Sequence, residues 1–250
     1  MVMKRLLLLI LFVCATITSV SSKSIGKIYV VSVGISDYKN IQDLNLPEQD
    51  AKNIANLYKT KTKHVILITG RYATKSRILQ SLRDQFARAN ENDMVVFSFS
   101  GHGFQGGICP YDMSEQFSSG ITFQEIRSIL KQSCAKCKVI FADACFSGGM
   151  RENSNHNISH LNNDNSKILL FLSSRGGESS IESPFMANGL FTTYLIRGLR
   201  GGADYNFDKK ITAKELFNFV HKGVVEKSNS NQHPVMWGQF DDNWILMDWR

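Results

Sequence analysis

The sequence predicts an α/β fold, a three-layer α/β/α sandwich in which helices cover both faces of a mainly parallel central sheet. Apolar runs of strand length, rich in Val, Ile and Phe, recur along the chain, and such continuous runs are typical of strands covered on both faces. Segments with helical periodicity alternate with these runs. This alternation predicts βαβ units with right-handed crossovers and a sheet between two helical layers.

The elements follow one another in a regular order. The predicted strands are 27–35, 64–69, 94–100, 138–144 and 167–174. The predicted helices are 48–59, 74–89, 122–132, 189–199 and 212–224. Thr74 is placed to cap the second helix, and Thr122 with Glu125 fits a capping box at the start of the third. The aromatic segment 237–249 is expected to pack as a final strand or hairpin.

The first 22 residues have the layout of a secretory signal peptide. Lys4 and Arg5 precede an apolar core, and small residues follow it. A lipoprotein would use Cys14, but the preceding Val13 is bulkier than lipidation sites normally accept. We therefore expect cleavage and secretion or periplasmic export. Residues 23–250 should form one large α/β domain, long enough to bury a single core.

The charge pattern argues against a nucleic-acid partner. The formal net charge of +7 becomes +5 when Lys4 and Arg5 are removed, and the remaining basic residues are scattered singly among acidic and polar ones. Such a pattern is typical of a solvated surface. No later segment has 18 uninterrupted apolar residues, so no membrane contact is expected apart from the signal peptide.

The cysteines do not form a disulfide or metal framework. Four remain after the signal peptide, and they are Cys109, Cys134, Cys137 and Cys145. The Cys134–Cys137 pair precedes a predicted strand, whereas a thioredoxin-type pair opens a helix; a local disulfide or two free thiols are the alternatives. One such pair with no partner motif is too little for zinc. We expect no metal and no cofactor.

Two predicted strands end in unusual loops. Strand 94–100 is followed by His102 between two glycines, and strand 138–144 is followed by Cys145 and then Phe-Ser-Gly-Gly. In parallel sheets, active residues gather outside the carboxyl ends of strands. Either residue alone is most often inert, but together they suit a thiol nucleophile and its base. The N–H groups of Gly103 and Cys145 would then hold the oxyanion.

These loops resemble the caspase-like cysteine peptidases, in particular the bacterial relatives of metacaspases and paracaspases. The resemblance rests on the segments SGHG and DACFSG, with VVSVGISDYKN, SSRGGESSIE and NGLFTTYLIRGLRGGADYN in the same order, and covers residues 27 to 240. It implies a caspase-like fold, an endopeptidase working through a thioester, His102 and Cys145 as the catalytic dyad, and the Gly103 and Cys145 amides as oxyanion donors. Phe146 departs from the usual second histidine of metacaspases, and the family's calcium-binding aspartates are missing from 118–126.

The resemblance also implies a substrate preference. Metacaspases and paracaspases cut after arginine or lysine and use three acidic pocket residues, which match Asp50, Asp143 and Glu182 here; Glu178 lies in the same loop as Glu182. Arg175 keeps open the alternative of a peptidase that cuts after aspartate. A caspase-fold pseudoenzyme that binds peptides or supports assembly is the alternative from another functional class, although both members of the dyad are present.

Two further segments carry hypotheses. The polar segment 150–167 offers Arg151 and Lys167 as sites of self-cleavage after a basic residue.

The segment 204–215 resembles a calcium-binding EF-hand loop; its candidate ligands are Asp204, Asn206, Asp208 and Glu215. Lys209 stands where that loop needs glycine, so we interpret it as a turn that caps the next helix rather than as a metal site.

Overall fold

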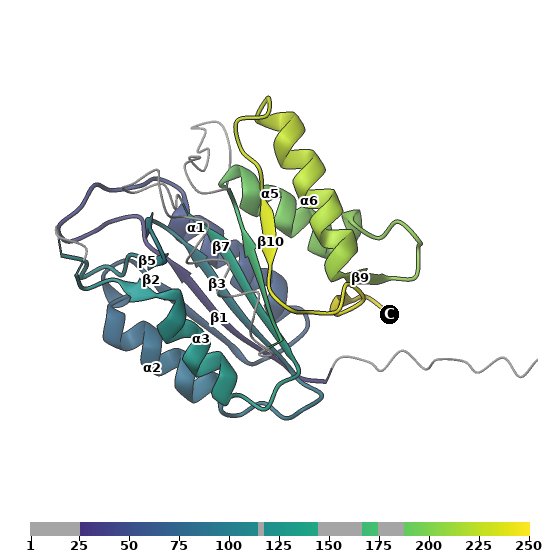
Figure 1. Ribbon diagram of the computed structural model, residues 1–250, viewed down its shortest axis with the longest axis horizontal. Coiled ribbons are helices and arrows are strands. Elements are labelled where there is room, and N and C mark those ends of the chain that lie inside the picture. The colour runs from purple at the N-terminus through teal and green to yellow at the C-terminus, as the bar shows by residue number, and fades with distance from the viewer. Residues whose placement is uncertain (1–25, 115–117, 145–166, 175–187) are drawn as a thin grey trace, which may run out of the picture.

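A six-stranded sheet forms the centre of the protein, which we describe from a computed structural model (Figure 1). The structure describes residues 26–114, 118–144, 167–174 and 188–250. The strand order is β10-β8-β7-β3-β1-β2. Its strands are β1 (Ile28–Gly34), β2 (Val65–Thr69), β3 (Met94–Ser100), β7 (Cys137–Asp143), β8 (Ile168–Leu172) and β10 (Val235–Trp237). All pair in parallel except β10, which is antiparallel to β8 at one edge.

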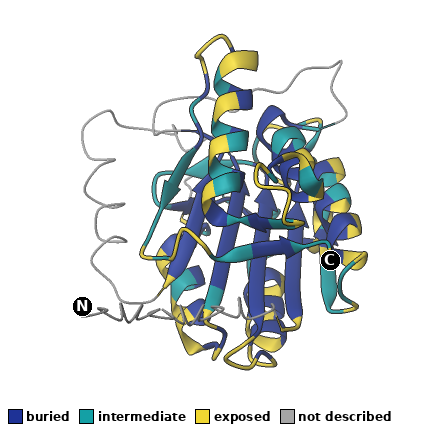
Figure 2. Cartoon of the chain, turned by 90° about the vertical axis from the view of Figure 1, so that its right-hand side faces the viewer, coloured by how far each residue is buried: buried dark blue, intermediate teal, exposed yellow. Residues whose placement is uncertain are grey.

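Helices cover both faces of this sheet. One face packs against α2 (Lys75–Phe86) and α3 (Phe123–Gln132). The other packs against α1 (Pro47–Lys59), α5 (Leu190–Arg197) and α6 (Ala213–Lys227). The residues of β1 alternate between the two apolar clusters. β1, β3 and β8 are buried along their whole length, whereas the edge strands β2 and β10 are mostly half-buried (Figure 2). The predicted three-layer α/β/α fold is therefore confirmed.

The sequence signals for helix starts correspond to real caps. The Thr74 hydroxyl accepts the backbone N–H of Arg77 at 3.3 Å. Thr122 and Glu125 form the predicted capping box of α3, and Thr212 and Glu215 form a second one at α6. Because each cap satisfies amide groups that the helix itself cannot, it fixes where the chain turns from strand to helix. The predicted helix 189–199 is shorter than expected: regular α-helix ends at Arg197, and a π-helical turn, η2 (Gly198–Gly202), follows.

Most of the short strands outside the main sheet were not predicted. One small sheet joins β4 (Gly103–Phe104), β5 (Gly107–Ile108) and β6 (Ile121–Thr122), and another joins β9 (Lys210–Thr212) to β11 (Ile245–Asp248). Strands of two or three residues are too short to show the period-two pattern on which a prediction depends. The prediction of a C-terminal strand is confirmed by β11. The hairpin alternative is wrong, because β10 and β11 belong to different sheets.

None of the helices among the described residues combines the length and the apolar character needed to cross a bilayer.

Candidate active site

The two strands that precede the predicted dyad lie side by side and end at the same level. β3 and β7 pair in register, and the last residues of the two strands, Ser100 and Asp143, are partners. The pairing continues one residue further, since the Gly101 N–H donates to the Asp143 carbonyl at 3.1 Å. His102 and Cys145 each come two residues after this last pair.

His102 is held at its backbone and at its ring by the segment that follows β1. Its backbone N–H donates to the hydroxyl of Tyr38 at 2.7 Å, and the two rings are tilted with centroids 5.0 Å apart. The imidazole Nε2 lies 2.8 Å from the carbonyl oxygen of Gln42. Because this segment follows the strand next to β3, the sheet order itself brings it to the histidine.

The contact with Gln42 selects one tautomer of the imidazole. A carbonyl oxygen only accepts hydrogen bonds, so Nε2 must carry the proton. In the neutral ring the lone pair then lies on Nδ1, which is the nitrogen that can take a proton from a thiol. The backbone carbonyl of Gln42 thus orients the His102 ring in the way that a carboxylate orients the imidazole of a Ser-His-Asp triad.

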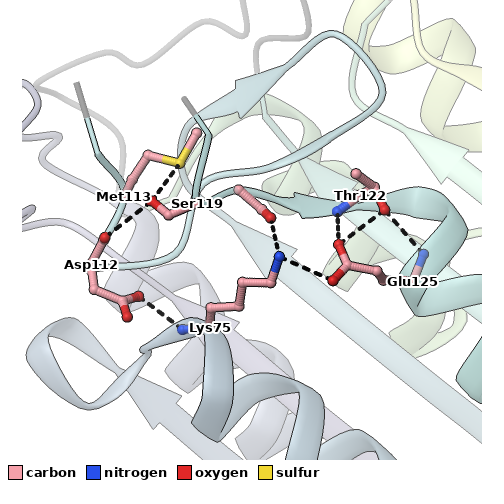
Figure 3. Close-up of polar contacts among 7 residues, drawn as sticks. Lys75, Asp112, Met113, Ser119, Thr122 and Glu125 are labelled. Carbon is pink, nitrogen blue, oxygen red and sulfur yellow. Dashed lines mark hydrogen bonds and ion pairs between the residues drawn. The ribbon is translucent and has the colours of Figure 1, made fainter. Parts of the chain in front are cut away.

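The chain beyond His102 is braced against two helix starts. Gly103 begins β4, and the loop that returns toward β6 is tied to Lys75 at the first turn of α2 (Figure 3). The Lys75 ammonium donates to the Gly120 carbonyl at 2.7 Å and pairs with Glu125 at 3.0 Å, while the Lys75 backbone N–H donates to Asp112 at 2.8 Å. The network lies at the β6 end of the small sheet β4-β5-β6, whose first strand contains Gly103.

Cys145 itself lies outside the described residues, and Ala144 is the last described residue before it. The Ala144 N–H lies 3.1 Å from the Ser173 hydroxyl oxygen, and that hydroxyl donates to the Ala144 carbonyl at 3.2 Å. Ser173 follows β8, and its carbonyl accepts a hydrogen bond from the Gln232 side chain at 2.8 Å. The backbone leading into Cys145 is therefore anchored by buried polar groups.

Asp50 and Asp143, two of the three predicted pocket acids, converge in space. Both are buried, with 2% and 7% of their surface exposed. Asp50 accepts the Gly189 N–H at 3.0 Å and the Ser100 hydroxyl at 2.8 Å, and Asp143 accepts the Thr192 hydroxyl at 2.8 Å. A Cβ atom on Gly189 would lie 2.7 Å from Asp143 Oδ2 and 3.2 Å from Asp50 Oδ2. The third predicted acid, Glu182, lies outside the described residues, as do Arg175 and Glu178.

The three described cysteines are free thiols, and two are poor nucleophiles. Burial raises the pKa of Cys109 to about 12 and also raises the pKa of Cys137. Cys137 begins β7 and Cys134 precedes it, so both lie at the amino end of a strand whose carboxyl end is next to His102. A seven-residue strand spans roughly 20 Å, which removes this pair from the histidine.

The segment 204–215 forms a tight turn made by its own side chains. Asp204 accepts the backbone N–H groups of Asp208 and Lys209, and Glu215 caps α6. Lys209 adopts a positive φ of 65° despite the cost expected for a lysine. Among the described residues, no group of three or more His, Cys, Asp or Glu side chains is arranged to hold a metal ion.

Comparison with protein families identifies the chain. The caspase domain model matches residues 28–243. The chain belongs to the caspase family. Membership in this family implies a cysteine peptidase that acts on proteins, and it confirms the resemblance drawn from the sequence motifs. No match was found among curated proteins.

Two solved structures show how closely the chain follows the caspase fold. Protein GSU0716 of Geobacter sulfurreducens is 17% identical, with a TM-score of 0.67 over 89% of this chain and 98% of that one. Caspase-1 of Spodoptera frugiperda is 15% identical, with a TM-score of 0.64 over 89% of this chain and 90% of that one. At these identities the likeness concerns the fold.

Three residues of the site had no role in the sequence interpretation. Tyr38 and Gln42 contact the backbone and the ring of His102, and Ser173 contacts the backbone of Ala144, the residue before Cys145. Tyr38 stood within the segment VVSVGISDYKN on which the resemblance was based, but nothing in the sequence showed that its hydroxyl would reach His102. Ser173 opens the segment SSRGGESSIE of the same resemblance, but nothing in the sequence showed that its hydroxyl would reach Ala144. Gln42 has no sequence signal, because it acts through its backbone carbonyl.

Proposed function

We propose that this caspase-family chain is a cysteine endopeptidase in which His102 and Cys145 form the catalytic dyad and peptides are cut after arginine or lysine. The observation that carries the proposal is the hydrogen bond between His102 Nε2 and the Gln42 carbonyl, which reserves Nδ1 for proton transfer. The register of β3 and β7 supports it further, because the strands that lead to the two residues end opposite each other.

The proposed reaction begins with proton transfer from the Cys145 thiol to His102 Nδ1. A free cysteine is only a few per cent thiolate at neutral pH, so it needs such a base. The thiolate attacks the peptide carbonyl, and the N–H groups of Gly103 and Cys145 bind the oxyanion. The imidazolium then protonates the leaving amine, which leaves a thioester. Water, deprotonated by His102, hydrolyses the thioester and regenerates the thiol.

The preference for a basic side chain is proposed from Asp50 and Asp143. Two buried carboxylates that converge beside Gly189 form a region of negative charge, where a guanidinium or ammonium group would gain charge-assisted hydrogen bonds. Asp50 is also joined to the Ser100 hydroxyl, which lies two residues before His102. This contact links the acids to the catalytic end of β3.

Peptide cleavage tests the proposal directly. Fluorogenic peptides that differ only in a final arginine, lysine or aspartate would be offered to the purified wild-type protein and to the Cys145→Ala and His102→Ala variants. We expect cleavage of the arginine and lysine peptides, and its loss in both variants. Cleavage of the aspartate peptide alone would contradict the proposed pocket, and absence of any cleavage would favour a peptide-binding pseudoenzyme.

The same proposal includes self-processing and export. A basic residue within 150–167, such as Arg151 or Lys167, would be cut by the chain's own active site. Intact-mass analysis of wild type and Cys145→Ala would show two fragments for the former and one mass for the latter; identical single masses would contradict self-processing.

The proposal of export rests on residues 1–22. The amino-terminal sequence of the protein recovered from its native host would show whether this segment is removed.

A further inference from the structure

We propose that Tyr38 is a positioning residue that fixes His102 in the tautomer required of the base. Its hydroxyl accepts the His102 backbone N–H at 2.7 Å, and its ring packs against the imidazole at a centroid distance of 5.0 Å. The tyrosine therefore contacts both the backbone and the side chain of the same residue. The expected effect on kcat rests on the proposed function, whereas the expected effect on the His102 tautomer does not.

Tyr38 is itself held rigidly enough to serve as a support. Tyr38 is buried, with 8% of its surface exposed, and its backbone N–H donates to the Asp43 carboxylate at 2.8 Å. The next residue, Lys39, donates its backbone N–H to the Tyr111 carbonyl at 3.2 Å. Burial raises the pKa of Tyr38, so the hydroxyl stays un-ionised and keeps its donor and acceptor capacity at any pH where the histidine is active.

The glycine before the histidine gives the hydroxyl its access. Gly101 has a φ of 155°, and a Cβ atom there would lie 2.5 Å from the Tyr38 hydroxyl oxygen and 2.9 Å from the ring of Phe99. Any side chain at this position would push the phenol away from the His102 N–H. The first glycine of the SGHG segment is therefore explained by the approach of Tyr38, in addition to any role near a substrate.

The consequence for the imidazole follows from its second anchor. Gln42, whose carbonyl binds Nε2, lies in the same segment as Tyr38, four residues further along the chain. The segment thus holds His102 at its backbone with one residue and at its ring with another. When the tyrosine hydroxyl is removed, the His102 backbone is released, the Nε2 contact with Gln42 loosens, and the proton exchanges between the two ring nitrogens.

Tyr38→Phe tests this role, because it removes the hydroxyl and keeps the ring. With the peptide that wild type cleaves, we expect kcat to fall about tenfold or more while KM stays within about twofold, since substrate binding is untouched. Nitrogen NMR of the imidazole should show His102 protonated mainly at Nε2 in wild type and redistributed toward Nδ1 in the variant. A purely structural role for Tyr38 would not move this tautomer signal.

Tyr58→Phe is the matched control. Tyr58 is also buried, its hydroxyl has no hydrogen-bond partner in the described part of the chain, and it packs in the cluster on the opposite face of the sheet. We expect the control to keep both wild-type kcat and the wild-type tautomer. Wild-type kinetics together with a wild-type tautomer in Tyr38→Phe would overturn the inference.

A measurement on the wild-type protein tests the inference even if the Tyr38→Phe variant does not fold. The His102 amide proton should exchange slowly with solvent, because it is bonded to a buried hydroxyl; rapid exchange in the native protein would overturn the inference without any substitution. If wild type cleaves no peptide, the proposed function fails, but the tautomer and exchange measurements still decide the role of Tyr38.

Discussion

The Ser173 hydroxyl contacts both backbone polar groups of Ala144, and its oxygen lies 3.1 Å from the nitrogen and 3.2 Å from the carbonyl oxygen of that residue. Ala144 directly precedes the proposed nucleophile, and Ser173 is fully buried. The hydroxyl therefore acts on the backbone that carries Cys145, in the way that the Tyr38 hydroxyl acts on the backbone of His102. A hydroxyl from another segment thus binds the backbone of His102 and the backbone of the residue before Cys145.

Replacement of Ser173 by alanine should reduce both stability and activity. The change leaves the N–H and carbonyl of Ala144 without this partner in a buried site, which costs about 1–3 kcal/mol of the free energy of unfolding. Loss of backbone position should also lower kcat about tenfold or more. Denaturant unfolding and peptide kinetics measure the two effects.

The control for this prediction is Ser133→Ala. Ser133 is also buried, and its hydroxyl donates to the Phe86 carbonyl at 2.8 Å, but it lies after α3, before the amino end of β7. It should lose a similar amount of stability and keep wild-type kcat. Equal kcat values for Ser173→Ala and wild type would contradict the anchoring role.

Gly189→Ala should disturb the proposed pocket. The added methyl group would lie 2.7 Å from Asp143 Oδ2 and 3.2 Å from Asp50 Oδ2, so the carboxylates must separate or α5 must shift. We expect KM for an arginine peptide to rise roughly tenfold, with a loss of stability of about 1–3 kcal/mol from overpacking.

Gly198→Ala provides a comparison in which only stability should change. A Cβ atom at Gly198 would lie 2.7 Å from Leu216 and 3.1 Å from Phe219, in the apolar contact between α5 and α6. Its KM should equal that of wild type. An unchanged KM in Gly189→Ala would show that the two acids do not contact the substrate.

The fold was predictable because each main strand and helix carries its own local signal. Residues 94–100 are mainly apolar and form β3 with the predicted bounds, and Thr122 with Glu125 marked the start of α3. The position of His102 followed from the same signal, since a residue that ends a parallel strand lies at the carboxyl edge of the sheet. Asp50 and Asp143 required the family resemblance, because an acidic residue in a first helical turn or at a strand end is common.

The supports of the site were not predictable, because they depend on contacts between distant segments. Tyr38 and His102 are separated by 64 residues, and Ser173 and Ala144 by 29. Neither contact produces a periodic pattern or a motif. The pairing of β11 with β9 was missed for the same reason. The sequence shows that 245–247 is apolar, but the choice of partner depends on where the chain returns after α6.

Acid should weaken the brace formed by Lys75 and Glu125. Partial burial alone raises the pKa of Glu125, but hydrogen bonds from Thr122 and Lys75 outweigh it and lower the pKa below its ordinary value. The carboxylate thus adds stability above its unfolded pKa of about 4.3, and this contribution is lost as the pH falls through the lower, folded pKa. The difference in melting temperature between wild type and Glu125→Gln should be largest near neutral pH and disappear in acid.

Glu91→Gln is the comparison for this pH series. Glu91 pairs with Lys136 at 2.9 Å, but the two side chains are 72% and 62% exposed, so the pair contributes little. Its removal should change the melting temperature only slightly at any pH. If Glu125→Gln behaves in the same way as Glu91→Gln at neutral pH, the brace does not stabilise the fold.

The described cysteines should differ sharply in reactivity. Cys134 is exposed, whereas Cys109 is fully buried with its pKa raised to about 12 by burial, and burial also raises the pKa of Cys137. Because the thiolate is the reactive form, alkylation at pH 8 of native Cys145→Ala should modify Cys134 first, and the other two only after unfolding. Peptide mapping by mass spectrometry identifies the sites. Protection of Cys134 that is lifted only by a reductant would instead reveal a disulfide with Cys137, the alternative in which that pair is oxidised.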